Sequence, residues 1–150
     1  MKYPTQLLIC FLFFSAFCKK ENQPTESLSF QTIVNGPWIQ AQYLEDQDGN
    51  GTFTDESLPC ELDNTWVFNA DTTMSYNDIG VLCAPDFGPI SIPGNWLLTE
   101  NDQVLLVSLS SGFTEEAFNI VTLNDTLMVL HKKDLNNPSA PVTQKVVLER

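Results

Sequence analysis

The sequence has 150 residues, of which 19 are acidic and 7 are Lys or Arg, so its formal net charge at pH 7 is −12. A chain of this length indicates one domain. So acidic a chain disfavours binding to nucleic acid or to anionic lipid head groups, which need a basic patch. A net charge of this size also favours solubility.

The chain begins with the features of a signal peptide. Lys2 precedes an unbroken apolar run over residues 7–14, which is the pattern of a charged start followed by a hydrophobic centre. Even when the run is extended to Phe17, it is shorter than the roughly 20 residues that span a bilayer. We therefore predict a signal peptide over residues 1–17, and hence export.

Residues 15–18, Ser-Ala-Phe-Cys, resemble the lipobox of bacterial lipoproteins, in which small residues precede a cysteine that receives acyl chains. Phe17 departs from the usual Gly, Ala or Ser, but looser lipoboxes occur in Bacteroidetes-type lipoproteins. The alternative is ordinary signal-peptidase cleavage near Ala16, which Phe14 disfavours because that cleavage needs small residues. The resemblance implies a lipid on Cys18 that anchors an outer-membrane lipoprotein in the bacterial cell envelope, facing the periplasm or the surface.

A tether is expected after the lipid anchor. Residues 19–32 are polar, contain one Pro and show no period, which is linker composition. We predict a flexible tether over residues 18–35 and a folded domain over residues 36–150. The charged residues 19–21 also resemble the surface-export signal of Bacteroidetes-type lipoproteins, although a solvated spacer would have the same composition.

The domain itself is predicted to be all-β, because apolar residues do not recur at helical spacing and short β-rich runs alternate with turn signals. The expected strands are 38–44, 65–69, 73–78, 96–99, 103–110, 117–123, 126–133 and 142–148, with a short extension at 90–93. Eight strands joined mostly by tight turns form a meander, which closes into an up-and-down barrel. Runs that are apolar on both faces leave a β-sandwich as the alternative.

Two Gly-x-Trp motifs carry a resemblance to a known family. Residues 36–38 open the first strand with Gly-Pro-Trp, and residues 94–96, Gly-Asn-Trp, precede a later one. Lipocalins begin their first strand with this motif, and its Trp plugs the closed end of the barrel. With the lipoprotein start, the order of the motifs over residues 36–150 resembles the lipocalin-like domains of Bacteroidetes-type lipoproteins. The resemblance implies a barrel that binds a small apolar ligand or an envelope protein, and it implies the fold more than the function.

One feature of the family is not expected in this chain. Longer lipocalins have an Arg near the final strand that packs on the first Trp. The only Arg here is Arg150, the last residue, so we do not predict its contact with Trp38.

The aromatic residues are candidates for the core or for the wall of a ligand cavity. They are Trp38, Trp66, Phe68, Trp96 and Phe118. Large aromatic side chains fill small β folds, and a barrel of this length has little room once its own side chains occupy it, which favours a core. A ligand cavity lined by aromatic and aliphatic side chains is the functional alternative.

Cys60 and Cys83 remain once Cys10, in the apolar run, and Cys18 are set aside. In an oxidising compartment they form one candidate disulfide. Neither lies in a Cys-x-x-Cys motif and His131 is the only histidine, so a zinc site would lack ligands.

The acidic loop at residues 46–51, Asp-Gln-Asp-Gly-Asn-Gly, resembles the start of a calcium loop. Its oxygen ligands at alternate positions would be Asp46, Asp48, Asn50 and Thr52. The twelfth position should be a bidentate Glu but is Ser57, and the same residues are typical of a solvated hairpin turn. Calcium is the only cofactor that the sequence suggests, with a plain turn as the alternative.

The sequence shows no recognisable combination of catalytic residues. A Ser–His–acid system would need His131, which lies near a strand end. The adjacent acids at 55–56 and 115–116 point to opposite faces of an extended chain, so neither pair shares a site. We predict a non-catalytic binding protein. The alternative is a β-sandwich adhesion or accessory module that binds a glycan or protein through the loops at 45–64 and 80–93.

Overall fold

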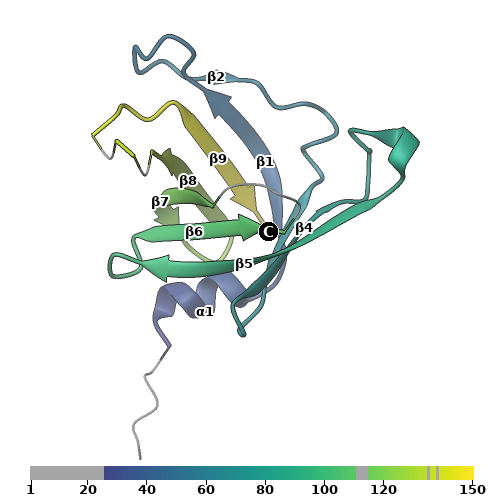
Figure 1. Cartoon of the computed structure of the whole chain (residues 1–150), viewed down its shortest axis with the longest axis horizontal. Coiled ribbons are helices and arrows are strands. Elements are labelled where there is room, and N and C mark those ends of the chain that lie inside the picture. Colours follow the sequence, from purple (N-terminus) through teal and green to yellow (C-terminus); the bar gives the residue numbers. More distant parts are fainter. Residues whose placement is uncertain (1–25, 111–114, 135, 138) are drawn as a thin grey trace, which may run out of the picture.

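Figure 1 shows the protein as a computed structural model, which describes residues 26–110, 115–134, 136–137 and 139–150. The predicted signal peptide, Cys18 and the first part of the predicted tether lie outside the described residues. Within the described chain, the elements are α1 (Leu28–Val34), β1 (Trp38–Glu45), β2 (Thr54–Asp55), β3 (Thr65–Phe68), β4 (Thr73–Asp78), η1 (Pro85–Phe87), β5 (Ile90–Thr99), β6 (Val104–Leu109), β7 (Glu116–Leu123), β8 (Leu127–Lys133) and β9 (Gln144–Glu149).

The strands form a closed antiparallel barrel. From β3 to β9 each strand pairs with the next in sequence, and β1 pairs with both β3 and β9. Ile39, for example, lies opposite Thr65 on one side and Glu149 on the other. The short β2 pairs only with β1 and lies outside the ring of eight. The predicted up-and-down barrel is therefore confirmed, and the β-sandwich alternative is wrong.

The strand β5 is longer than the sequence indicates, because the separate segments predicted at 90–93 and 96–99 are one continuous strand. Pro93 sits inside it opposite Ser75, and its carbonyl accepts a hydrogen bond from Ser110 N (2.8 Å). Gly94 follows where the backbone runs close to β6, since a Cβ there would lie 2.4 Å from Ser108 O. The Pro–Gly pair thus marks a close approach of two strands rather than a break.

The helix α1 is absent from the sequence-based prediction, and the flexible tether predicted through residue 35 is wrong over this segment. Ser27 caps the helix by accepting a hydrogen bond from Phe30 N (3.1 Å). Phe30, Ile33 and Val34 follow at helical spacing and pack against the core, where Ile33 is fully buried. Seven residues are too few for a periodic pattern to stand out against polar neighbours.

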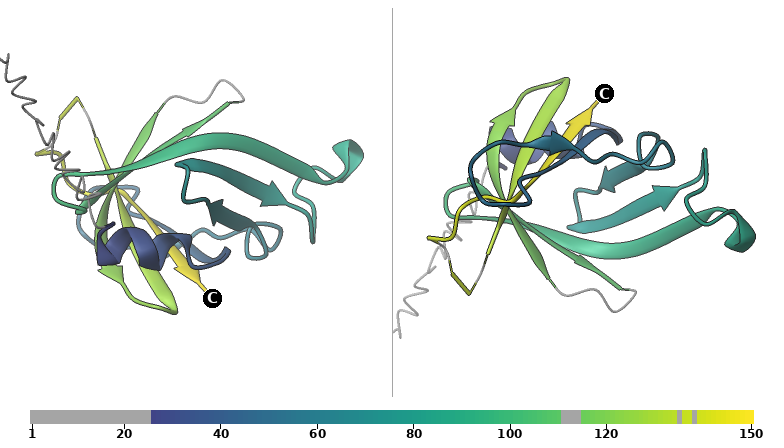
Figure 2. Two further views of the ribbon diagram at one scale, coloured as in Figure 1. Left: turned by 90° about the horizontal axis from the view of Figure 1, so that it is seen from below. Right: turned by 90° about the horizontal axis from the view of Figure 1, so that it is seen from above.

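The helix α1 lies across one end of the barrel (Figures 1 and 2). Side chains fill the half of the barrel next to this helix. Trp38 is fully buried there, and its Nε1 donates to Ile33 O (2.9 Å). Trp96 stacks on Phe30 with centroids 5.1 Å apart and meets Phe68 edge-on at 5.4 Å. Of the five aromatic candidates, Trp38, Phe68 and Trp96 therefore form the core of the closed half.

Candidate functional site

The other half of the barrel is hollow. It contains a cavity of about 360 Å³ that reaches the strand ends opposite α1 (Figure 1), where Lys132 near the end of β8 and Gln144 at the start of β9 line it. That volume lies at the lower end of the roughly 300–1,000 Å³ range of small-molecule sites. The barrel thus has a filled half and a half that can hold a small ligand.

A bulge in β1 decides which of its residues face the cavity. The pairing with β9 shifts between Gln40 and Gln42, so one extra residue is inserted there. Trp38 and Gln40 face inward before the bulge, and Tyr43 does so after it. Without this shift, strict alternation would place Tyr43 on the outside.

The floor of the cavity is mainly aromatic and aliphatic. Trp66 and Phe118, the two remaining aromatic candidates, both line it, beside Val107 and Val146. The ring of Trp66 meets that of Phe118 at 79°, with centroids 6.3 Å apart. Gln40, which is 7% exposed, adds the one polar side chain at this depth among the described residues.

The rim of the cavity is polar and charged. Its residues are half-buried side chains from five strands and one loop, namely Tyr43, Glu61, Tyr76, Glu116, Lys132 and Gln144. Lys132 Nζ lies 2.9 Å from Glu116 Oε1 and forms an ion pair with it. Glu45, next to the rim, accepts hydrogen bonds from the Tyr43 hydroxyl and from Gln144 Nε2 (3.2 Å).

The two tyrosines at the rim have raised pKa values, to which burial and the nearby carboxylates both contribute. Burial raises the pKa of Tyr43 well above its usual range, and its hydrogen bond to Glu45 and the charges of Glu45, Glu61 and Glu116 raise it further. Burial also raises the pKa of Tyr76, with Glu61 as the next contribution. Both phenols therefore resist ionisation, because burial disfavours their charged form and the nearby carboxylates repel a further negative charge.

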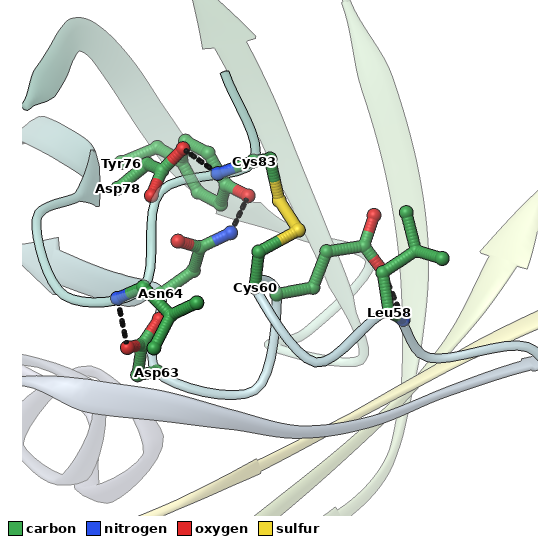
Figure 3. The surroundings of a disulfide bond; sticks show 9 residues. Leu58, Cys60, Asp63, Asn64, Tyr76, Asp78 and Cys83 are labelled. Atoms are coloured by element: carbon green, nitrogen blue, oxygen red, sulfur yellow. Dashed lines mark hydrogen bonds between the residues drawn. A yellow bond between two sulfur atoms is a disulfide. The ribbon is translucent and has the colours of Figure 1, made fainter. Parts of the chain in front are cut away.

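The disulfide expected between Cys60 and Cys83 is confirmed, with an S–S distance of 2.01 Å. It joins the loop that carries Glu61 to the loop between β4 and β5 (Figure 3). Asp78 supports the second loop by accepting from Cys83 N (3.2 Å). The cross-link therefore fixes the loop that carries Glu61, a cavity residue, to the loop between β4 and β5.

The acidic loop at 46–51 has the hydrogen bonds of a turn. The carboxylate of Asp46 is buried and accepts from Asn50 N (3.1 Å) and Gly51 N (2.7 Å). Asn50 Oδ1 accepts from Thr52 N (2.7 Å), and Asp48 Oδ2 from Asn50 Nδ2 (2.8 Å). Backbone and amide N–H groups thus occupy the oxygens that calcium would need. Among the described residues, no three His, Cys, Asp or Glu side chains are grouped as a metal site, and calcium binding stays a prediction.

The residues considered for catalysis do not come together. His131 lies half-buried on β8, where burial and then the charge of Lys145 lower its pKa below the usual range. Asp55 accepts hydrogen bonds from Ser57. Glu115 is exposed whereas Glu116 lines the cavity, as expected for neighbours on opposite faces.

Sequence reasoning missed most of the rim. Tyr43, Tyr76, Lys132 and Gln144 are not among the predicted site residues, and Glu116 was considered only as one of a pair of acids. Their signal is a polar residue at an inward position near the end of a strand. That signal is readable only once the bulge and the strand pairings are known.

These features define a class of protein: an antiparallel eight-stranded barrel, closed at one end by a helix and open at the other, with an interior cavity. The family model described as a lipocalin-like domain matches residues 34–130. The chain belongs to this lipocalin-like family, as its Gly-x-Trp motifs predicted. No curated protein matches the sequence. Over the described residues, no helix has the length and apolar character needed to cross a membrane.

Proposed function

We propose that this protein binds a small molecule in the cavity of its barrel, without catalysis, as an exported lipoprotein of the bacterial cell envelope. The observation that carries the proposal is the one-ended cavity, whose floor of Trp66, Val107, Phe118 and Val146 is apolar. Lipocalin-like proteins are generally binding proteins rather than enzymes, which supports the same function.

The lipid anchor at Cys18 rests on the sequence. The apolar run, the lipobox-like residues 15–18 and the polar residues that follow support it. An envelope protein as partner stays a prediction. The exposed apolar side chains of Leu58, Ile79 and Val81, on the loops next to the disulfide, would be the surface for such a partner.

The binding proposal can be tested on the mature chain, residues 18–150 with Cys18→Ala, exported behind an ordinary signal peptide so that the disulfide forms. Native mass spectrometry should reveal a co-purified small molecule. A neutral fluorescent probe such as N-phenyl-1-naphthylamine should also bind, with energy transfer from tryptophan.

A matched pair of variants locates the site. Val107→Phe places a ring in the cavity and should abolish probe binding, whereas Leu106→Phe places the same ring at the neighbouring residue of β6, which does not line the cavity. Equal binding by both folded variants would show that the probe does not occupy the barrel.

A further inference from the structure

We propose that the ligand of this cavity is a small amphiphilic cation, an amine or quaternary ammonium with a short apolar tail, and not a fatty acid or another amphiphilic anion. The inference rests on the proposed function and specifies the chemistry of the ligand. It follows from the arrangement of apolar, charged and aromatic groups along the cavity.

The cavity changes character from floor to rim. Its floor has buried apolar side chains, with Val107 and Phe118 both less than 5% exposed. Its rim has half-buried carboxylates, an ammonium group and phenols. A ligand that fits both ends has an apolar part to place against Trp66 and a polar head to leave at the mouth, where solvent keeps the desolvation cost small.

The charges at the rim determine the sign of that head group. Glu116 is neutralised by Lys132 at 2.9 Å. Within the described part of the chain, Glu61 accepts from Leu58 N (3.1 Å), and Glu45 accepts from Tyr43 and Gln144, none of which is cationic. Among the described residues lining the cavity, Lys132 alone is positive.

Two carboxylates, Glu61 at the rim and Glu45 next to it, therefore have no cationic partner among the described residues. Their charge would attract a cation and repel an anion over a few ångströms. Burial is the largest cause of the raised pKa values of Tyr43 and Tyr76, and the charge of Glu61 contributes to the rise of both.

Aromatic rings line the path between floor and rim. Tyr76 meets Trp66 at 90° with centroids 5.8 Å apart, and both rings line the cavity with Tyr43. Rings set at right angles present π faces on more than one side of a ligand. Alkylammonium groups are bound by such faces in many sites, so the rings and the carboxylates favour the same head group.

The test compares three probes with the same tail: octyltrimethylammonium, octanol and octanoate, each added to the mature chain at low salt. Quenching of tryptophan fluorescence and calorimetry report binding. We expect the cation to bind roughly fivefold or more tighter than octanol, the scale of one partly screened ion pair, and octanoate to bind weakest. Added salt should reduce the difference.

A pair of charge variants shows whether the rim is responsible. Glu61→Gln keeps the oxygen that Leu58 N needs but removes the charge, so cation binding should weaken by roughly fivefold while octanol binding is unchanged. Glu115→Gln removes the same charge from an exposed residue outside the cavity and should have little effect.

The two proposals fail differently. Octanoate binding as tightly as the cation, or equal cation binding by Glu61→Gln and wild type, would overturn the cationic ligand while leaving the cavity as a binding site. If none of the three probes binds, and nothing co-purifies, the proposed binding function itself fails.

Discussion

The guanidinium group of Arg150, the last residue, lies over the indole ring of Trp38, near the start of the domain, with its central carbon 3.8 Å from the ring centroid. Its Nη1 donates to Asp125 O (3.2 Å) and its Nη2 donates to Thr32 O at the end of α1. The contact that we did not expect is therefore present. Closure of the barrel explains it, because Glu149 of β9 lies opposite Ile39 of β1.

Arg150→Ala should lower the free energy of unfolding by roughly 1–2 kcal/mol, because it removes a cation–π contact and hydrogen bonds to carbonyls. Arg150→Lys keeps the charge but lacks the planar fork and should recover only part of that loss. Urea denaturation measures both. Equal stability of Arg150→Ala and wild type would mean that the contact does not stabilise the barrel.

Ile33→Ala tests whether α1 belongs to the domain. Ile33 is fully buried against the core, so its truncation should cost roughly 2–4 kcal/mol. Leu28→Ala is the matched control in the same helix, because Leu28 is 80% exposed and its loss should change stability by less than about 0.5 kcal/mol. If both substitutions have similarly small effects on stability, α1 does not belong to the folded domain and the segment is a tether, as the sequence predicted.

Cys60→Ser should destabilise the exported protein by roughly 3 kcal/mol, since the disulfide closes a loop between residues 23 apart in sequence. Thermal unfolding with and without a reducing agent provides the control. Reduction should lower the melting temperature of wild type but leave that of the variant unchanged. An unaltered melting temperature in the variant contradicts a stabilising role for the bond.

The two tyrosines give a pH prediction, because Tyr43 and Tyr76 are the only tyrosines after the predicted signal peptide. Both have pKa values raised by burial. Their neutral form stabilises the fold fully below the unfolded-state pKa of about 10, and this contribution is lost as pH rises from there through the folded-state pKa. Tyrosinate absorbance should therefore appear at higher pH in the folded protein than in denaturant. Tyr43→Phe isolates Tyr76, and ordinary titration of both residues would contradict the described burial.

Cys18→Ala in the full-length chain should move the protein from the membrane fraction to the soluble fraction, because the lipid would have no attachment site. Cys60→Ser removes a cysteine outside the lipobox and should leave the distribution unchanged. Fractionation and intact mass of both variants measure the outcome. Continued membrane association of Cys18→Ala, with its signal peptide removed, would refute lipidation there.

The barrel could be predicted from the sequence, but the residues that line its cavity could not. Alternating strand patterns and turn residues predict the meander, and two remaining cysteines allow one pairing. The inward position of Tyr43 depends on the bulge after Gln40. No residue type at this place in the sequence indicates a bulge. The ion pair of Glu116 with Lys132 depends on the register between β7 and β8. Such relationships arise from pairings between distant strands, and local patterns do not encode them.

The position of α1 also determines how the cavity would be presented in the envelope. The chain enters the domain through this helix, at the filled end of the barrel, and the mouth lies at the far end. A lipid on Cys18 would therefore attach the protein through the filled end of the barrel, and the opening would lie at the end that is farther from the attachment point. Ligand would then be exchanged with the aqueous compartment or with a facing partner, and not drawn directly from the membrane that holds the anchor.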